Sequence, residues 1–240
     1  MVHEHSDRFL SAFSRIEQHL RKITRSSKQD TFSTLLTRAV SQASIKGFSD
    51  DLREFADLRN AIVHERGGGY VIAEPHQETV DRLEQIEKFV SQPPTIESLG
   101  TIPVVTCSPS DPIGKAAKAM FEGKFSQLPV YHYEKCIGLL TSETIARWIA
   151  AKFQPNLDIL EEAPVEQVLL YKEEDSVYQF ISRKTPIADV VALFDRTAHS
   201  GKSLDAVIIT HSGKPDQQPL HILTVYDLPR LYRKAGLTSD

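Results

Sequence analysis

The chain has 240 residues, of which 40% are hydrophobic and 25% are charged. These proportions are typical of a folded soluble protein and exclude a mostly disordered chain. The formal net charge of −4 gives no overall basic field that would attract nucleic acid. No apolar run approaches the roughly 20 residues of a membrane helix, and the first residues do not read as a signal peptide. We therefore expect a cytoplasmic protein without a membrane partner.

The sequence offers little for a disulfide framework or a metal site. Its two cysteines, Cys107 and Cys136, are too few for a framework and are typical of a reducing compartment. His3 and His5 have a spacing that can bind a metal, but no third ligand accompanies them. We expect no metal and no required cofactor.

The N-terminal part has the hydrophobic periodicity of helices. Apolar residues recur at three- and four-residue steps, as in the stripe from Phe9 to Ile23. Ser6 is expected to cap the first helix. Gly67 to Gly69 are expected to end the third, because glycine tolerates a positive φ. The expected helices are 6–24, 32–40, 49–65 and 76–91.

After a linker at Pro93-Pro94, short β-rich segments alternate with helical ones. The order strand, helix, strand, strand, helix occurs twice. The first set is expected at 102–105, 112–122, 128–133, 136–140 and 142–153, and the second at 177–182, 186–196, 204–210, 220–223 and 226–234.

These two sets form an internal repeat. Proline, apolar and threonine positions recur in one order, and the matching pairs are Pro112-Ile113 with Pro186-Ile187, Pro129-Val130 with Ala206-Val207, and Leu140-Thr141 with Leu223-Thr224. We therefore predict an α+β protein. An all-α helical bundle at 1–92 is followed by a tandem β-α-β-β-α pair at 93–240, whose copies span about 96–153 and 161–235.

Four segments resemble the CBS domain, a β-α-β-β-α module named after cystathionine β-synthase. They are Phe125 to Val130 and Cys136 to Thr141 in the first copy, and Ser203 to Ile209 and His221 to Asp227 in the second. In that family the copies come in tandem and pack as a pseudo-twofold Bateman module, often with an adenine nucleotide or adenosyl ligand between them. The resemblance implies AMP, ADP, ATP or S-adenosylmethionine as a regulatory ligand, and a homodimer.

The chemistry of such a ligand site is visible in Thr224 and Asp227. A threonine at a strand end, with aspartate three residues on, places a carboxylate in the first turn of a helix. The carboxylate can accept both ribose hydroxyls, while the helix N-terminus favours phosphate. By the resemblance, Phe125 stacks on the adenine, and the cleft is completed by Thr101 to Val104, Ser126 and Ile222. Alternatively, Asp227 simply caps a helix.

The first copy departs from this pattern. Thr144 stands where the aspartate would be, and Glu143 is one position early. The second, pseudo-symmetric site is therefore expected to be weakened or empty, which leaves at most one nucleotide per chain.

The segment from Arg59 and Asn60 to His64 resembles the Arg-x4-His motif of HEPN domains, a superfamily of helical domains. Many of its members are metal-independent RNA endonucleases that act as dimers. The resemblance, which covers about 6–92, implies that Arg59 stabilises the phosphate and that His64 acts as general acid or base, while Asn60 either orients the histidine or donates to the phosphate. Alternatively, the three residues line a polar dimer seam. Acidic neighbours such as Asp57 argue against strong RNA binding.

Three functions follow from these observations. The first is a regulatory protein whose CBS pair binds an adenine nucleotide and biases the HEPN-like domain. The second is an RNA endonuclease controlled by the CBS pair, with Arg59, Asn60 and His64 as its catalytic residues. The third is an interaction scaffold without ligand or catalysis.

Overall fold

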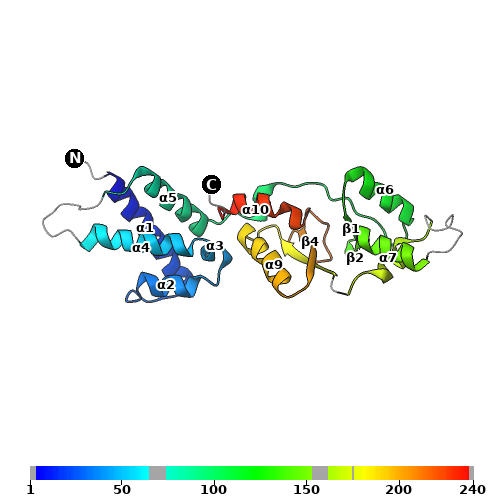
Figure 1. The fold of residues 1–240 in the computed structure, drawn as a ribbon, viewed down its shortest axis with the longest axis horizontal. Helices are drawn as coiled ribbons and strands as arrows, with labels where there is room; N and C mark the ends of the chain where they lie inside the picture. Colours follow the sequence, from blue (N-terminus) through cyan, green and yellow to red (C-terminus); the bar gives the residue numbers. More distant parts are fainter. Residues whose placement is uncertain (1–3, 65–73, 153–161, 175, 238–240) are drawn as a thin grey trace. The chain divides into compact units, whose positions relative to one another are not determined.

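The computed structural model describes residues 4–64, 74–152, 162–174 and 176–237 (Figure 1). Its contacts divide the chain into two compact units. The first unit groups Met1–Thr95 with Pro186–Leu193 and Leu228–Asp240, and the second groups Ile96–Thr185 with Phe194–Asp227. Within the described ranges, no helix combines the length and the apolar character that crossing a bilayer requires. The domain boundary expected after residue 92 stays a prediction.

The expected N-terminal helices are present. They are α1 (Glu4–Thr24), α2 (Phe32–Ala39), α4 (Ser49–His64) and α5 (Gln77–Ser91), with a short α3 (Ala43–Lys46) in addition. α3 was not predicted, because a helix of 4 residues is too short to show a hydrophobic period. The glycines expected to end α4, Gly67 to Gly69, lie outside the described residues.

The apolar stripe of α1 forms the centre of the helical core. Phe9, Ile16 and Leu20 are each at most 1% exposed. The ring of Phe9 meets that of Phe55 on α4 edge-on, with the centroids 5.9 Å apart. Burying each such side chain stabilises the fold by about 1.5–3 kcal/mol, so this stripe holds the helices of the first unit together.

The cap predicted for α1 is wrong. The helix begins at Glu4, so that Ser6 lies in its first turn and is fully buried. The carboxylate of Glu74 accepts hydrogen bonds from the backbone N–H groups of His5 and Ser6, at 3.0 and 3.3 Å, and from the Ser6 hydroxyl. The N–H groups of a first helical turn need acceptors. Here a carboxylate remote in the sequence supplies them, which no local pattern reveals.

In the second unit, the first set of elements is built around a hairpin. α6 (Ile113–Gly123) precedes the antiparallel strands β1 (Gln127–His132) and β2 (Lys135–Thr141), and α7 (Ser142–Lys152) follows them. The two helices flank the hairpin (Figure 1). Their common core contains Ile113, Met120, Leu128, Val130, Leu140 and Trp148.

The strand expected at 102–105 is wrong. The structure has no regular element there, and the pairing occurs later, where Cys107 makes a single parallel bridge to Val130. Pro103 has no N–H with which to join a ladder. Ile102 and Val105 are 48% and 42% exposed, so burial does not favour a strand either.

The second set of elements follows the predicted order. It consists of β3 (Ser176–Ser182), α9 (Ile187–His199), β4 (Ser203–Thr210), β5 (His221–Leu223), the 3₁₀ turn η3 (Val225–Asp227) and α10 (Leu228–Ala235). β4 pairs with β3 in parallel and with β5 antiparallel. β1 likewise has a parallel bridge on one side and an antiparallel strand on the other. The α+β class is confirmed, and both sets pair in the same way. Short elements that were not predicted are η1 (Ile96–Leu99), α8 (Val165–Val168) and η2 (Leu169–Tyr171).

Candidate functional site

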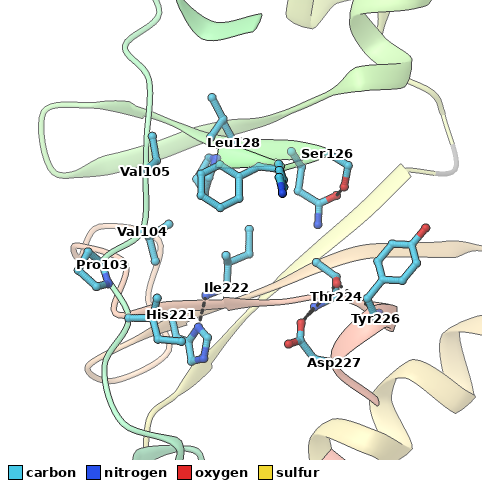
Figure 2. A pocket seen from close by; sticks show the side chains of 15 residues that line it. Pro103, Val104, Val105, Ser126, Leu128, His221, Ile222, Thr224, Tyr226 and Asp227 are labelled. Atoms are coloured by element: carbon cyan, nitrogen blue, oxygen red, sulfur yellow. Dashed lines mark hydrogen bonds between the residues drawn. The ribbon is translucent and has the colours of Figure 1, made fainter. Parts of the chain in front are cut away.

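The second unit contains a pocket of about 440 Å³ whose walls come from both sets of elements (Figure 2). One wall is the irregular segment that precedes α6, a second is the end of α6 with the start of β1, and a third is β5 with η3. In Figure 2, Ser126 and Leu128 lie across the pocket from Ile222 and Thr224. The lining residues are Ile102, Pro103, Val104, Val105, Lys124, Phe125, Ser126, Gln127, Leu128, Pro129, His221, Ile222, Thr224, Tyr226 and Asp227.

Asp227 is fixed by hydrogen bonds to Thr224. The backbone N–H and the hydroxyl of Thr224 donate to Oδ2 of Asp227, at 2.9 and 3.3 Å. In return, the backbone N–H of Asp227 donates to the carbonyl of Thr224 at 3.0 Å. Oδ1 takes no hydrogen bond from the residues that the structure describes, so a ligand can donate to it. The carboxylate is thus held in place with one oxygen still able to accept.

Phe125 reaches the pocket because of the way α6 ends. Lys124 adopts a left-handed conformation with φ 55°, and the N–H of Phe125 donates to the carbonyl of Met120 at 2.9 Å. This is the geometry of a left-handed helix stop. It brings the Phe125 ring back over the last turn, where a Cβ on Gly123 would lie 2.2 Å from Phe125 Cε2. The Phe125 ring can therefore occupy this position only because residue 123 is a glycine.

The corresponding turn of the first copy is different. The backbone N–H of Thr144 donates to the hydroxyl oxygen of Thr141 at 3.0 Å, and the two hydroxyl oxygens are 2.8 Å apart. Thr144, which stands in place of the aspartate, is buried. A smaller hollow of about 150 Å³ lies beside this turn, and its lining residues are Ser126, Gln127, Thr141, Ser142, Glu143, Glu173 and Asp205. The weakening expected for this second site stays a prediction.

Most residues predicted for the nucleotide site line one pocket. These are Phe125, Ser126, Ile222, Thr224 and Asp227. Thr101 is not among the lining residues; the wall begins at the next residue, Ile102.

Among the lining residues that sequence reasoning missed are Lys124, His221 and Tyr226; the others are Val105, Gln127, Leu128 and Pro129. His221 is buried, and its Nδ1 accepts the backbone N–H of Ile222 at 3.0 Å (Figure 2). Tyr226 is 85% exposed. Lys124, His221 and Tyr226 are each adjacent in sequence to a predicted site residue. This adjacency was the one feature of the sequence that could have indicated them.

The residues of the HEPN-like motif are described only in part. The guanidinium carbon of Arg59 lies 5.8 Å from the ring centroid of Phe13 on α1. Its Nη1 donates to Oδ1 of Asn60 at 3.1 Å. His64 is the last residue of α4, and its side chain lies outside the described residues. The side chains of Arg59 and Asn60 are therefore in contact with each other. The guanidinium of Arg59 also packs over Phe13, and this cation–π contact stabilises the helical bundle.

Neither cysteine has the character of a nucleophile. Burial raises the pKa of the Cys107 thiol to about 12 and also raises the pKa of the Cys136 thiol. Both thiols are therefore protonated near neutral pH. Among the described residues, no cluster of three or more His, Cys, Asp or Glu side chains is arranged to hold a metal ion.

The family model of the CBS domain matches residues 96–151. No curated protein matches the sequence. Among solved structures, protein MJ1225 from Methanocaldococcus jannaschii has a TM-score of 0.45 and 14% identity, over 62% of this chain and 52% of that one. The CBS domain pair of protein MJ0100, in complex with 5′-methylthioadenosine and S-adenosyl-L-methionine, has a TM-score of 0.43 and 17% identity, over 59% and 97%. CBSX2 in complex with AMP has a TM-score of 0.42 and 15% identity, over 59% and 98%.

Proposed function

Because residues 96–151 match the CBS domain, we propose that this protein is a regulator that senses an adenine nucleoside or nucleotide in the pocket beside Asp227. One observation carries the proposal. A single pocket contains the half-exposed ring of Phe125 and the anchored carboxylate of Asp227, which retains an accepting oxygen. Its volume of about 440 Å³ is typical of a small-molecule site.

The lining residues match the parts of a nucleoside. Stacking a base on an aromatic ring contributes about 1–3 kcal/mol, and Phe125 is the ring that can do so. A carboxylate accepts strong hydrogen bonds from hydroxyl groups, which suits Oδ1 of Asp227 to the ribose. The apolar wall from Ile102 to Val105 covers the faces of a planar base.

The same wall can read the edge of the base. Within the described residues, no hydrogen bond engages the backbone of residues 102–105. Its N–H and C=O groups are therefore available to the donors and acceptors of an adenine, except that Pro103 has no N–H. In a paired strand these backbone groups would form hydrogen bonds with the neighbouring strand. Because residues 102–105 form no strand, the groups remain available to a ligand.

Adenosine is expected to raise the Tm of the full chain. A ligand that binds only the folded state stabilises it by about 2.7 kcal/mol at a concentration of 100 times Kd. Differential scanning fluorimetry with adenosine, AMP, ADP, ATP and S-adenosylmethionine tests this, and isothermal titration calorimetry gives the affinity. Uridine is the control, because it has the same ribose with a smaller base. If no adenine compound shifts Tm or releases binding heat, the proposal is wrong.

The proposal extends to the helices of the first unit, which would be the regulated, HEPN-like part. Asp227 is followed directly by Leu228, the first residue of α10, and α10 belongs to the first unit. Leu237, shortly after α10, packs against the helical core, and a Cβ on Gly47 would lie 2.1 Å from its Cδ2. A ligand that holds Asp227 therefore acts on a residue joined covalently to a segment of the bundle, and can shift its equilibria. The homodimer and a contact with RNA stay predictions.

Binding of adenosine is expected to slow amide hydrogen exchange in α10 and in the helices of the first unit. Hydrogen–deuterium exchange with and without adenosine measures this, because exchange reports local opening. The second unit should be protected near the pocket in either case. Protection confined to the pocket would contradict the regulatory part of the proposal and leave the binding part intact.

A further inference from the structure

The pocket beside Asp227 has few charges with which to hold phosphates. Among its lining residues, the side chains with a full charge are those of Lys124 and Asp227, and these have opposite signs. The remaining lining residues are apolar or neutral, apart from the ionisable ring of His221. A nucleoside polyphosphate would therefore meet one lysine and one carboxylate, with no surplus of positive side-chain charge to add to the partial positive charge at the N-terminus of α10.

The neighbouring hollow makes the surroundings acidic. It shares Ser126 and Gln127 with the pocket, so the two adjoin at these residues. Its lining contains the carboxylates of Glu143, Glu173 and Asp205. Arg147 pairs with Glu173 at 2.8 Å and partly neutralises it, and the Ser203 hydroxyl donates to Asp205 Oδ1 at 2.8 Å. A ligand group that extends past Ser126 thus approaches negative charge.

These charges act against a phosphate chain and not against the nucleoside. A single phosphate group carries about −1.5 to −2 near pH 7, and each further phosphate adds to that charge. Like charges repel, and where both are exposed to solvent the repulsion is screened by salt. A neutral or cationic substituent on the ribose avoids the repulsion.

From this charge distribution we infer that the pocket selects adenine nucleosides with a neutral or cationic 5′ substituent and discriminates against polyphosphates. The inference rests on the proposed function, because it concerns the same pocket. Glu143 and Asp205, which lie outside that pocket, act as specificity-determining residues for the ligand charge.

Isothermal titration calorimetry on the full chain tests the selection. Adenosine and S-adenosylmethionine are expected to bind about tenfold or more tightly than ATP at low ionic strength, and the difference should shrink at high salt. In the double variant Glu143→Gln with Asp205→Asn, the affinity for ATP should rise several-fold while that for adenosine stays the same. Both substitutions keep the shape of the side chain, and Asn still accepts from Ser203, which donates to Asp205 Oδ1 at 2.8 Å in the unsubstituted protein.

Two results would overturn the inference. One is an ATP affinity equal to or higher than that of adenosine, and the other is a double variant in which both affinities change equally. These differ from the failure of the proposed function, in which neither adenosine nor any other adenine compound binds.

Discussion

Replacing Asp227 by asparagine is expected to lower the affinity for adenosine about 10- to 100-fold, while the free energy of unfolding stays within about 0.5 kcal/mol of the wild type. Asparagine keeps one oxygen, which can still accept from the N–H and the hydroxyl of Thr224. Its amide nitrogen takes the place of Oδ1 and cannot accept from a ribose hydroxyl. Hydrogen bonds to a charged group contribute about 1.5–3 kcal/mol, which corresponds to the stated loss.

The substitution separates the two roles that Asp227 can have. Calorimetry gives the affinity for adenosine, and urea denaturation gives the free energy of unfolding. Asp216→Asn is the matched control, because it makes the same chemical change at an exposed position outside the lining of the pocket. If D227N binds adenosine as tightly as the wild type and the Asp216 variant, Asp227 only holds the turn that precedes α10, as the capping alternative requires.

The parts of the fold that were predictable from the sequence are those with a local period or a repeated pattern. The stripe from Phe9 to Ile23 has the spacing of one helix face, and α1 buries it. The proline and threonine positions of the repeat marked the order of strands and helices in the second copy, and in the first copy from α6 onward, since no strand forms at 102–105. The start of α1 was not predictable, because Glu74, which bonds its first N–H groups, is distant in the sequence.

The site was predictable where a motif marks it and less so elsewhere. Thr224 and Asp227 form such a motif, and the resemblance added Phe125 from the other copy. Thr101 does not line the pocket, whose wall begins at Ile102. The segment it begins is not a strand, so the alternation of sides that would select particular residues does not apply. Sequence patterns also did not indicate that Gly123 matters for the site, because its importance depends on the position of the Phe125 ring in the folded protein.

Gly123→Ala is expected to lower the affinity for adenosine about tenfold without lowering the stability of the fold. The new Cβ would lie 2.2, 2.6 and 2.9 Å from three carbons of the Phe125 ring, so the ring must leave its place in the pocket wall. Stacking a base on such a ring contributes about 1–3 kcal/mol, which this displacement removes. The helix itself favours the change, because alanine exceeds glycine in helix propensity by up to about 1 kcal/mol.

A double-mutant cycle tests whether Gly123 acts through Phe125. Calorimetry with adenosine is carried out on Gly123→Ala, Phe125→Ala and the double variant. If Gly123 only positions the ring, the double variant binds no more weakly than Phe125→Ala alone, because the ring is already gone. Losses of affinity that simply add would show that Gly123 acts independently of the ring. Unchanged affinity in Gly123→Ala would show that Phe125 does not contact the ligand from this position, since a Cβ there cannot coexist with the ring as it lies.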